Sequence, residues 1–391
     1  MKAEPPMLTV NHQEQFLLRT LLQNIPDQIY FKDKQCRFIQ VNPTLAHRFG
    51  AESPEQVLGK TDFDFFTQEH AGAAYSDEQE IMRTGIPLVG REEQETWPDG
   101  TILWVTTTKL PLRDAKGEIV GTFGISRDIT ERKRAEMAVQ DSILYAERIQ
   151  KSMLSGPKNI TLPGLKFFHL FRPRDVVSGD FFWMTQREDK VFIAAVDCTG
   201  HGVPGAFLSL IGHSLLDEIV LSKGITEPNH ILTTLHENIR KNLNQSNETT
   251  SIRDGMDVCL CVLHAADKKI YFSGAKRPLY YTNAAGELFT CKGDRSSIGG
   301  LQREKNRTFT VHAIDLYPGQ TFYLTTDGYA DQPAMDSRKF GSMHLRALLQ
   351  EIHAIPLVEK QRKIEEALNQ HQTNQQQRDD ITVIGMEWSP E

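Results

Sequence analysis

Apolar and polar residues alternate along several short runs in the first third of the chain. Two such runs flank the turn KDKQ in NIPDQIYFKDKQCRFIQVN, and a helix is predicted to start near Pro43. Further along, TILWVTTTKLPL follows the turn PDG, and IVGTFGISRDIT follows DAKGE. A helical pattern from Glu14 to Leu22 precedes these strands. The pattern predicts a small antiparallel sheet with helices on one side, ending near Thr130.

The period changes after Thr130. The segment ERKRAEMAVQDSILYAERIQKSMLSGP contains no glycine or proline before Gly156, and most of its residues favour helix. Small or apolar residues recur at the steps of four and three that form a heptad seam: Ala135, Val139, Ser142, Ala146, Ile149 and Met153. We predict a connecting helix over 131–156 that pairs as a parallel dimeric coiled coil. The alternative is a helix packed against its own domain.

In the rest of the chain, apolar runs meet aspartates at their ends. These are Asp180 in RPRDVVSGDFFW, Asp197 after VFIAAV, Asp254 and Asp257 in DGMDVCLCVL, Asp327 and Asp331 after FYLTT, and Asp379 and Asp380 before ITVIGMEW. A single acid of this kind is commonly a turn or helix-cap residue. Several can converge at strand ends, and clustered carboxylates are costly unless cations neutralise them. All-oxygen ligands favour Mg²⁺ or Mn²⁺, and two such ions suit phosphate-ester hydrolysis.

Composition narrows the class of protein. A chain of 391 residues is longer than one core usually serves, so we expect two domains. No window approaches the roughly 18 apolar residues of a membrane helix, and MKAEPPMLTV lacks a secretory pattern, which predicts a cytoplasmic protein without a membrane partner. Five cysteines suit a reducing compartment, with Cys259 and Cys261 expected as buried thiols. The net charge of −7 disfavours a nucleic-acid partner.

The first domain carries a series of motifs: NIPDQIYFKD, FIQVNPTLAHRFG, VLGKTDFDFF, the WPDGTILWV hairpin and the closing GISRDITERKRAE. Through them, residues 14–132 resemble a PAS sensor domain, which implies a small-molecule or redox sensor, a dimerisation surface, or both. The ligand stays unknown. Cys36 is expected to be an ordinary buried cysteine rather than a flavin-reactive one, and His47 or His70 a surface residue rather than a haem ligand. The chain then divides into a tail (1–13), a PAS domain (14–130), a helical linker (131–156) and a second domain (157–391).

The second domain carries, in order, RIQKSMLSGP, FRPRDVVSGDFFW, AAVDCTGHGVPGAFLSLIG, GMDVCLCVL, FSGAKRPLYY, SSIGG, LTTDGYADQ, KFG and RDDITVIGM. With these segments, residues 165–389 resemble the SpoIIE-like branch of the metal-dependent protein serine/threonine phosphatases, the protein phosphatase 2C-like (PPM) superfamily. The resemblance implies an α+β fold in which two antiparallel sheets lie face to face between outer helices, an α-β-β-α sandwich. It also implies a site for two Mn²⁺ or Mg²⁺ ions at one edge.

The resemblance assigns roles to particular acids. Asp197 would bridge the two ions, helped by the backbone carbonyl of Cys198. Asp327 and Asp379 would hold one ion each or share one, and Asp180 would bind mainly through water. The resemblance gives Asp257 and Asp331 a supporting role or a weaker metal site. In the RDDIT pair it favours Asp379 as the ligand over Asp380.

Other polar residues near these acids allow two interpretations. His201 is a candidate catalytic residue that donates a proton to the leaving serine or threonine oxygen, or it only lines its loop, which is favoured. Arg172 or Arg174 contacts the phosphate or forms a surface ion pair. In SGAKRPLYY, Lys276 and Arg277 meet an acidic substrate face or belong to a structural hairpin, and the hairpin is favoured.

Together these features predict a PAS-regulated phosphatase that hydrolyses phosphoserine or phosphothreonine on a signalling protein. Family analogy suggests a partner of the anti-sigma-factor-antagonist type, and a homodimer formed through the PAS domain and the linker. The alternative is a catalytically weak scaffold that has kept the phosphatase fold. A nucleotide cyclase also uses aspartates and a dimerising linker, but the motif order disfavours it. The sequence leaves open the PAS signal, its direction of control, the substrate and the choice between Mn²⁺ and Mg²⁺.

Overall fold

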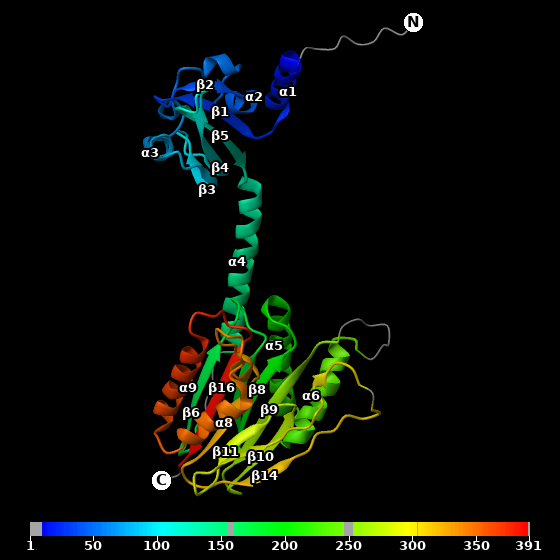
Figure 1. The fold of residues 1–391 in the computed structure, drawn as a ribbon. Helices are drawn as coiled ribbons and strands as arrows, with labels where there is room; N and C mark the ends of the chain where they lie inside the picture. Colours follow the sequence, from blue (N-terminus) through cyan, green and yellow to red (C-terminus); the bar gives the residue numbers. More distant parts are fainter. Residues whose placement is uncertain (1–9, 155–159, 246–252, 303, 390–391) are drawn as a thin grey trace. The chain divides into compact units, whose positions relative to one another are not determined.

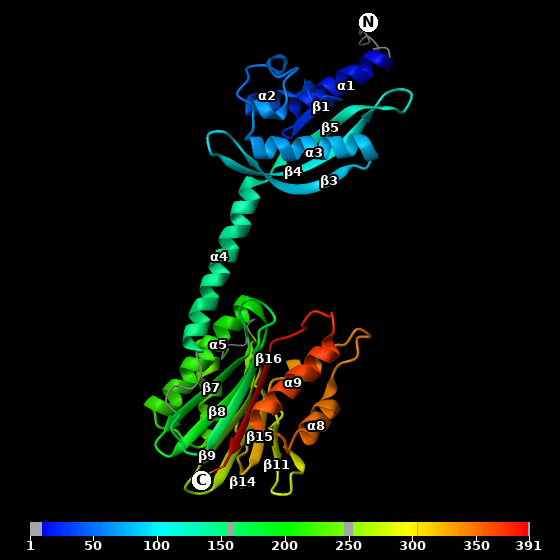
Figure 2. The same ribbon diagram turned by 90° about the vertical axis from the view of Figure 1, so that its left-hand side faces the viewer.

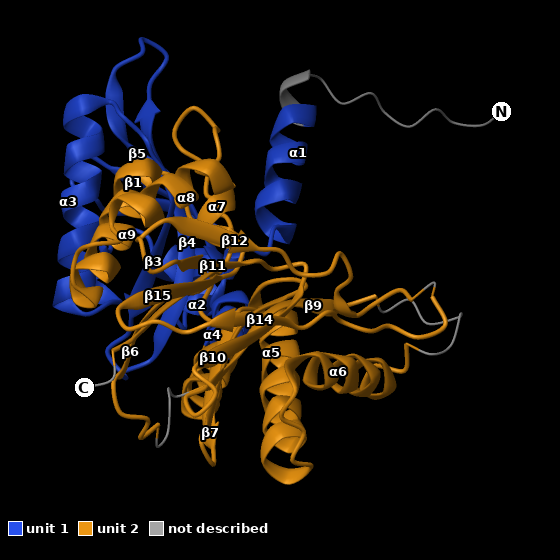
Figure 3. Cartoon of the chain, turned by 90° about the horizontal axis from the view of Figure 1, so that it is seen from below, with its two compact units in different colours: residues 1–140 blue, residues 141–391 orange. Residues whose placement is uncertain are grey.

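The computed structural model describes residues 10–154, 160–245, 253–302 and 304–389, and the chain separates into two compact units, residues 1–140 and 141–391 (Figure 3). The boundary between the units lies inside the helix predicted over 131–156. Residues 1–9 of the predicted tail and residues 155–156 of the predicted linker lie outside the described residues. Each unit has a hydrophobic core of its own.

The first unit, called the PAS unit below, is a five-stranded antiparallel sheet in the order β2-β1-β5-β4-β3 (Figure 1). Helix α3 lies on β3, β4 and β5 (Figure 2), and α2 packs against β1. This confirms the predicted sheet with helices. Its elements are α1 (Val10–Asn24), β1 (Gln28–Asp33), β2 (Phe38–Val41), α2 (Pro43–Arg48), the 3₁₀ turns Pro54–Gln56 and Asp62–Asp64, α3 (Gln68–Thr84), β3 (Leu88–Thr96), β4 (Ile102–Arg113) and β5 (Ile119–Asp128).

One buried side chain fixes the turn from β2 into α2. The Asn42 side-chain oxygen accepts hydrogen bonds from the backbone N–H of Leu45 (3.1 Å) and from that of Ile29 on β1 (3.0 Å). Its amide donates to the carbonyl of Asp27 (2.8 Å). Pro43 occupies the first turn, where its missing N–H leaves no bond unmade. Asn42 therefore starts the helix and holds it against the sheet.

Helix α4 (Thr130–Met153) matches the predicted connecting helix. Its seam is open to solvent in the single chain, since Val139, Ile149 and Met153 are 61%, 42% and 39% exposed. Near the end of α4, the buried Gln150 side chain donates to the carbonyl of Ser178 (2.6 Å) and accepts from its N–H (3.0 Å). These bonds fix the last turns of α4 on the second unit, and the pairing of two copies along the seam stays a prediction.

The second unit consists of two antiparallel sheets, ordered β14-β10-β9-β8-β7, with β13 beside β9, and β12-β11-β15-β16-β6. Its strands are β6 (Leu165–Arg172), β7 (Phe181–Arg187), β8 (Lys190–Cys198), β9 (Gly255–His264), β10 (Lys269–Ala275), β11 (Leu279–Thr282), β12 (Leu288–Cys291), β13 (Ile298–Gly299), β14 (His312–Asp315), β15 (Gln320–Thr325) and β16 (Ile381–Trp388). Its helices are α5 (Gly202–Asp217), continued by a π-turn (Glu218–Ser222), α6 (Pro228–Asn242), α7 (Gly328–Asp331), α8 (Gly341–Glu351) and α9 (Leu357–Gln372).

Three apolar clusters stack the layers of this unit. Helices α5 and α6 cover the outer face of the first sheet, and α8 and α9 cover the outer face of the second. The inner faces meet in a third cluster, which contains Ile193, Phe322 and Ile384. Cys259 and Cys261 lie in this cluster with no exposed surface, as predicted for buried thiols. The predicted α-β-β-α sandwich is confirmed.

Among the described residues, one helical stretch, Gly202–Ser222, is long and apolar enough to cross a membrane by length and composition alone. Half of its apolar window is buried inside the second unit, where α5 contributes Leu208, Leu215 and Leu216 to the core. A core helix meets the same test, so this stretch is accounted for by packing.

Candidate metal centre

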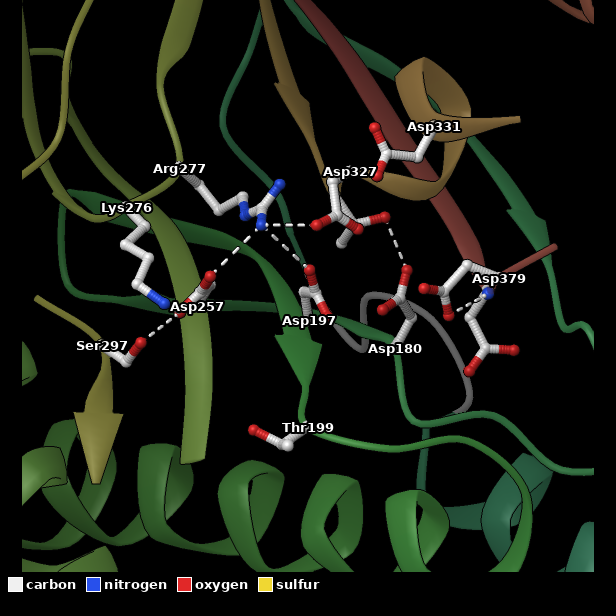
Figure 4. A network of polar contacts seen from close by, with 12 residues as sticks. Asp180, Asp197, Thr199, Asp257, Lys276, Arg277, Ser297, Asp327, Asp331 and Asp379 are labelled. Carbon is white, nitrogen blue, oxygen red and sulfur yellow. Dashed lines mark hydrogen bonds and ion pairs between the residues drawn. The ribbon is translucent and has the colours of Figure 1, made fainter. Parts of the chain in front are cut away.

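Five strand ends at one edge of the sandwich each carry an acid (Figure 4). Asp197, near the end of β8, lies opposite Asp257, near the start of β9. Asp180 directly precedes β7, Asp327 follows β15, and Asp379 precedes β16. Because neighbouring strands are antiparallel, the end of one and the start of the next share an edge. Acids up to 200 positions apart in the sequence, such as Asp180 and Asp379, are thereby brought together.

The surroundings of Asp180 and Asp197 strongly raise the pKa values of these two acids. Asp180 is 3% exposed and accepts a hydrogen bond from the Thr326 hydroxyl (2.5 Å). Burial, and then the charge of Asp197, raise the pKa of Asp180 well above its usual value. Burial, and then the charge of Asp327, raise the pKa of Asp197 to about 8. Burial also raises the pKa of Asp379. Without further positive charge, these carboxyl groups therefore favour the protonated form.

Arg277 lies between three of the acids. Its Nη2 is 2.8 Å from Oδ2 of Asp327, 3.2 Å from Oδ2 of Asp257 and 3.3 Å from Oδ2 of Asp197 (Figure 4). The favoured hairpin interpretation is wrong, since Arg277 lies on the turn between β10 and β11, and these two strands belong to different sheets. The guanidinium meets acids of its own chain, and a contact with an acidic substrate face stays a prediction.

Asp257 is held from both sides. Its Oδ1 accepts from the Ser297 hydroxyl (2.6 Å) and lies 3.4 Å from Nζ of Lys276, while Oδ2 faces Arg277. Sequence reasoning missed Ser297, Thr326 and the central position of Arg277. For Arg277, the sequence offers one signal, which is that Lys276 and Arg277 are two adjacent cations directly after a buried strand.

The glycine-rich loop after Asp197 packs backbone against backbone. A Cβ atom on Gly205 would lie 2.4 Å from the carbonyl oxygen of Gly200, and one on Gly179 would lie 2.5 Å from the same atom. Gly200 itself has φ of +86°, a conformation that other residues rarely adopt. Thr199 anchors the loop, since its N–H and hydroxyl both donate to the carbonyl of Gly255 (2.8 and 2.9 Å). The loop and the segment before Asp180 are therefore fixed against each other.

His201 caps this loop at the start of α5 but pairs away from the acids. Its Nδ1 lies 2.9 Å from Oδ2 of Asp175, and both side chains are about half exposed. Asp331 pairs with Lys339 (2.8 Å) rather than with the cluster. A role for His201 in proton transfer stays a prediction, and Asp331 stands at the rim of the site.

The two arginines predicted for phosphate contact have other partners or none nearby. Arg172 donates to the Asn369 side chain on α9 (2.8 Å) and lies 3.4 Å from Glu365. The Arg174 side chain is exposed, and its backbone N–H donates to Oδ1 of Asp380 (2.7 Å). Oδ2 of Asp380 accepts from the N–H of Gly179 (2.7 Å). Both oxygens of Asp380 thus hold the segment before Asp180, which leaves Asp379 as the freer acid of the pair.

The acids match a hard divalent cation in chemistry but do not yet enclose one. Within the described ranges, no three His, Cys, Asp or Glu side chains form a group that could hold a metal ion. The guanidinium lies among Asp197, Asp257 and Asp327 instead. The donor set consists of carboxylates, two of which, the buried Asp180 and the partly buried Asp197, have strongly raised pKa values, and Mg²⁺ or Mn²⁺ would stabilise their charged form. By donor chemistry the residues fit the implied cation.

Comparisons with known families agree with this arrangement. The family model described as stage II sporulation protein E (SpoIIE) matches residues 187–389, and the model described as a PAS fold matches residues 22–134. The solved SiaA-PP2C domain of Pseudomonas aeruginosa is 32% identical, with a TM-score of 0.57, and the match covers 65% of this chain and 99% of that domain.

Curated relatives match over shorter stretches. The methanogenesis regulatory histidine kinase FilI of Methanothrix harundinacea is 33% identical over 130 residues, which is 33% of this chain and 14% of that protein. The aerobic respiration control sensor protein ArcB of Escherichia coli is 27% identical over 143 residues, 37% of this chain and 18% of that protein. The chain therefore spans less than a fifth of the length of these two sensor proteins.

Proposed function

This chain belongs to the stage II sporulation protein E (SpoIIE) family, and we propose that it is a PAS-regulated, metal-dependent phosphatase that hydrolyses phosphoserine or phosphothreonine on a signalling protein. One observation carries the proposal: Asp180, Asp197, Asp327 and Asp379 converge at one edge of the sandwich from four different strand ends. The match to the SiaA-PP2C domain supports it.

In this proposal the carboxylates of Asp197, Asp327 and Asp379, with the carbonyl of Cys198, would hold two Mn²⁺ or Mg²⁺ ions. Ions bound there supply an activated water and neutralise the phosphoryl charge. The chain's own task is to keep the ligands in place. Thr326 orients Asp180 through its hydroxyl, and the packed glycines hold the loop after Asp197.

Residues around these ligands are proposed to position the ligands and to donate a proton to the leaving group. Asp380 ties the segment before Asp180 to β16 through two backbone N–H groups. We assign the protonation of the leaving serine or threonine oxygen to His201, whose imidazole is oriented by its contact with Asp175. The exposed position of this pair suits contact with a protein substrate rather than a small ester.

Regulation is proposed to run from the PAS unit through α4. The exposed seam of α4 supports a homodimer formed by the PAS unit and this helix, in which a change of register alters the second unit. By family analogy the substrate is a partner of the anti-sigma-factor-antagonist type, and the protein acts in the cytoplasm.

The experiment measures phosphate release from p-nitrophenyl phosphate and from a phosphoserine protein, with Mn²⁺ and with Mg²⁺. The Asp197→Asn variant is compared with Asp336→Asn, which changes an exposed acid of the same unit. Loss of a metal ligand is expected to lower kcat/KM by at least about 100-fold, since even its supporting residues can cost 10- to 100-fold. A wild-type protein that releases no phosphate from either substrate would instead be the scaffold alternative.

A further inference from the structure

Arg277 is held in place by its backbone. It follows Lys276, whose φ of +59° belongs to the left-handed region, on the short turn between β10 and β11. The N–H of Lys276 donates to the carbonyl of Asp294 (2.7 Å), and that of Arg277 donates to the carbonyl of Ala275 (2.8 Å). A Cβ atom on Gly274 would lie 2.4 Å from the carbonyl oxygen of Arg277. The packing of this turn therefore directs the Arg277 side chain toward the acids.

The guanidinium uses only part of its bonding capacity. One nitrogen, Nη2, serves Asp197, Asp257 and Asp327, and it touches only Oδ2 of each. Its Nε is buried and has no hydrogen-bond partner among the described residues. An unpartnered buried donor is costly, and an arginine edge with a free donor matches a phosphate oxygen. Nε is therefore an unpaired buried donor beside the nitrogen that contacts the three acids, and it can reach a phosphate only when the guanidinium turns.

Charge makes Arg277 a competitor for divalent ions. Asp197 and Asp327 are the acids that the proposed ions would use, and the guanidinium already neutralises them in part. Arginine does not lose its proton in proteins, so its charge cannot be removed by titration. A divalent ion arriving at these carboxylates meets a fixed positive charge only a few ångströms away. Among the described residues, Asp257 is the acid of the three that has further side-chain partners, Ser297 and Lys276.

We infer that Arg277 exchanges partners during the catalytic cycle. In the metal-free protein it is the counter-ion of Asp197, Asp257 and Asp327. If divalent ions held Asp197 and Asp327, the guanidinium would keep Asp257 and would turn Nε and the freed donor of Nη2 toward the phosphate of the substrate. This inference rests on the proposed function for its second half, and on the contacts around Arg277 for its first.

Two binding measurements test the exchange without turnover. Calorimetry measures Mn²⁺ binding to the full chain, and then inorganic phosphate binding to the Mn²⁺-loaded chain, for wild type and Arg277→Gln. The variant is expected to bind Mn²⁺ at least about tenfold more tightly, because a competing cation is gone, and phosphate at least about tenfold more weakly. A purely structural arginine would weaken both. The matched control is Arg338→Gln, which changes an 85% exposed arginine that pairs with Asp336, and it is expected to change neither affinity.

A second variant separates charge from geometry. Arg277→Lys keeps the positive charge and loses the planar fork, so we expect Mn²⁺ affinity close to wild type and weaker phosphate binding. Weaker Mn²⁺ binding in Arg277→Gln, or unchanged phosphate affinity in either variant, overturns the exchange. Thermal unfolding of each variant checks that it is folded. If the exchange pattern holds while the wild type hydrolyses nothing, the proposed function fails and the counter-ion role survives.

Discussion

Each unit of this protein buries a cluster of charged side chains, and the two clusters differ in balance and in exposure. In the PAS unit, Lys32 pairs with Asp62 and, at 2.6 Å, with Glu78, and the side chains of Lys32 and Glu78 are 1% and 0% exposed. In the second unit, the Arg277 side chain is 15% exposed and that of Asp327 is 39% exposed. The first cluster is closed around its cation, whereas the second is open on one side and surrounded by further acids.

The difference in exposure distinguishes a structural ion-pair network from a cluster that can bind a ligand. Burial alone would lower the pKa of Lys32, but Asp62 and Glu78 outweigh it and raise that pKa. In the second unit the acids likewise raise the pKa of Arg277 against the effect of burial, and burial raises the pKa of an acid in both clusters, Glu78 in the first and Asp197 in the second. The two clusters therefore differ chiefly in exposure and in the number of acids around the cation. An open cluster with excess acid is stabilised by any ligand that brings positive charge.

Removing the cation of the closed cluster is expected to have the largest effect on stability. Lys32→Met leaves Asp62 and Glu78 buried without their ion-pair partner, which should destabilise the PAS unit by about 3–5 kcal/mol. Hydrogen exchange of peptides from β1 and β2, measured against urea, reports this unit alone. Lys34→Met, at an exposed position on the adjoining turn, is the control. Equal effects of the two substitutions would mean that the closed cluster is not structural.

A smaller effect is expected from pH at Glu95, a 5% exposed residue of β3. Burial raises its pKa from 4.5 to about 7, against the lowering effect of Arg48. The folded state then keeps a proton that the unfolded state releases near pH 4.5. The contribution of Glu95 to the stability of the PAS unit is therefore fully present below pH 4.5 and is lost, by up to about 3 kcal/mol, as the pH rises through 7.

The same exchange experiment, run at pH 5 and pH 8, measures this slope. Glu95→Gln should flatten it, because the amide does not titrate. Glu118→Gln, at an exposed position of the same unit, is the control, and a slope that persists in Glu95→Gln assigns the pH dependence to another group.

The smallest effect is expected from adding a divalent cation, and it should fall on one unit only. Mn²⁺ at ten times its dissociation constant should stabilise the second unit by about 1.4 kcal/mol through binding to the folded state. Hydrogen exchange of β8 and β16 peptides should slow, while that of β1 peptides should not change. If Mn²⁺ slowed hydrogen exchange equally in both units, the open cluster would not be the specific binding site.

Much of the fold could be predicted from local pattern. The run TILWVTTTKLPL is β4, and the helix predicted over 131–156 is α4 (Thr130–Met153). Strand β3 (Leu88–Thr96) was missed because LVGREEQET is a charged edge strand without an apolar alternation. Helix α1 begins at Val10, four residues before the predicted start, since helix ends are weakly encoded.

The sequence alone determined which acids stand at strand ends, because apolar runs and turn residues are local signals, and the resemblance to known families assigned their roles. Only the tertiary structure decided which of these acids meet. Asp379 and Asp380 are adjacent, yet backbone N–H groups from residues 174 and 179 occupy both oxygens of Asp380. Arg277 reaches Asp197, Asp257 and Asp327 because sheet order places the turn after β10 beside β8, β9 and β15. Such contacts depend on strand order and packing between distant segments, which no local pattern specifies.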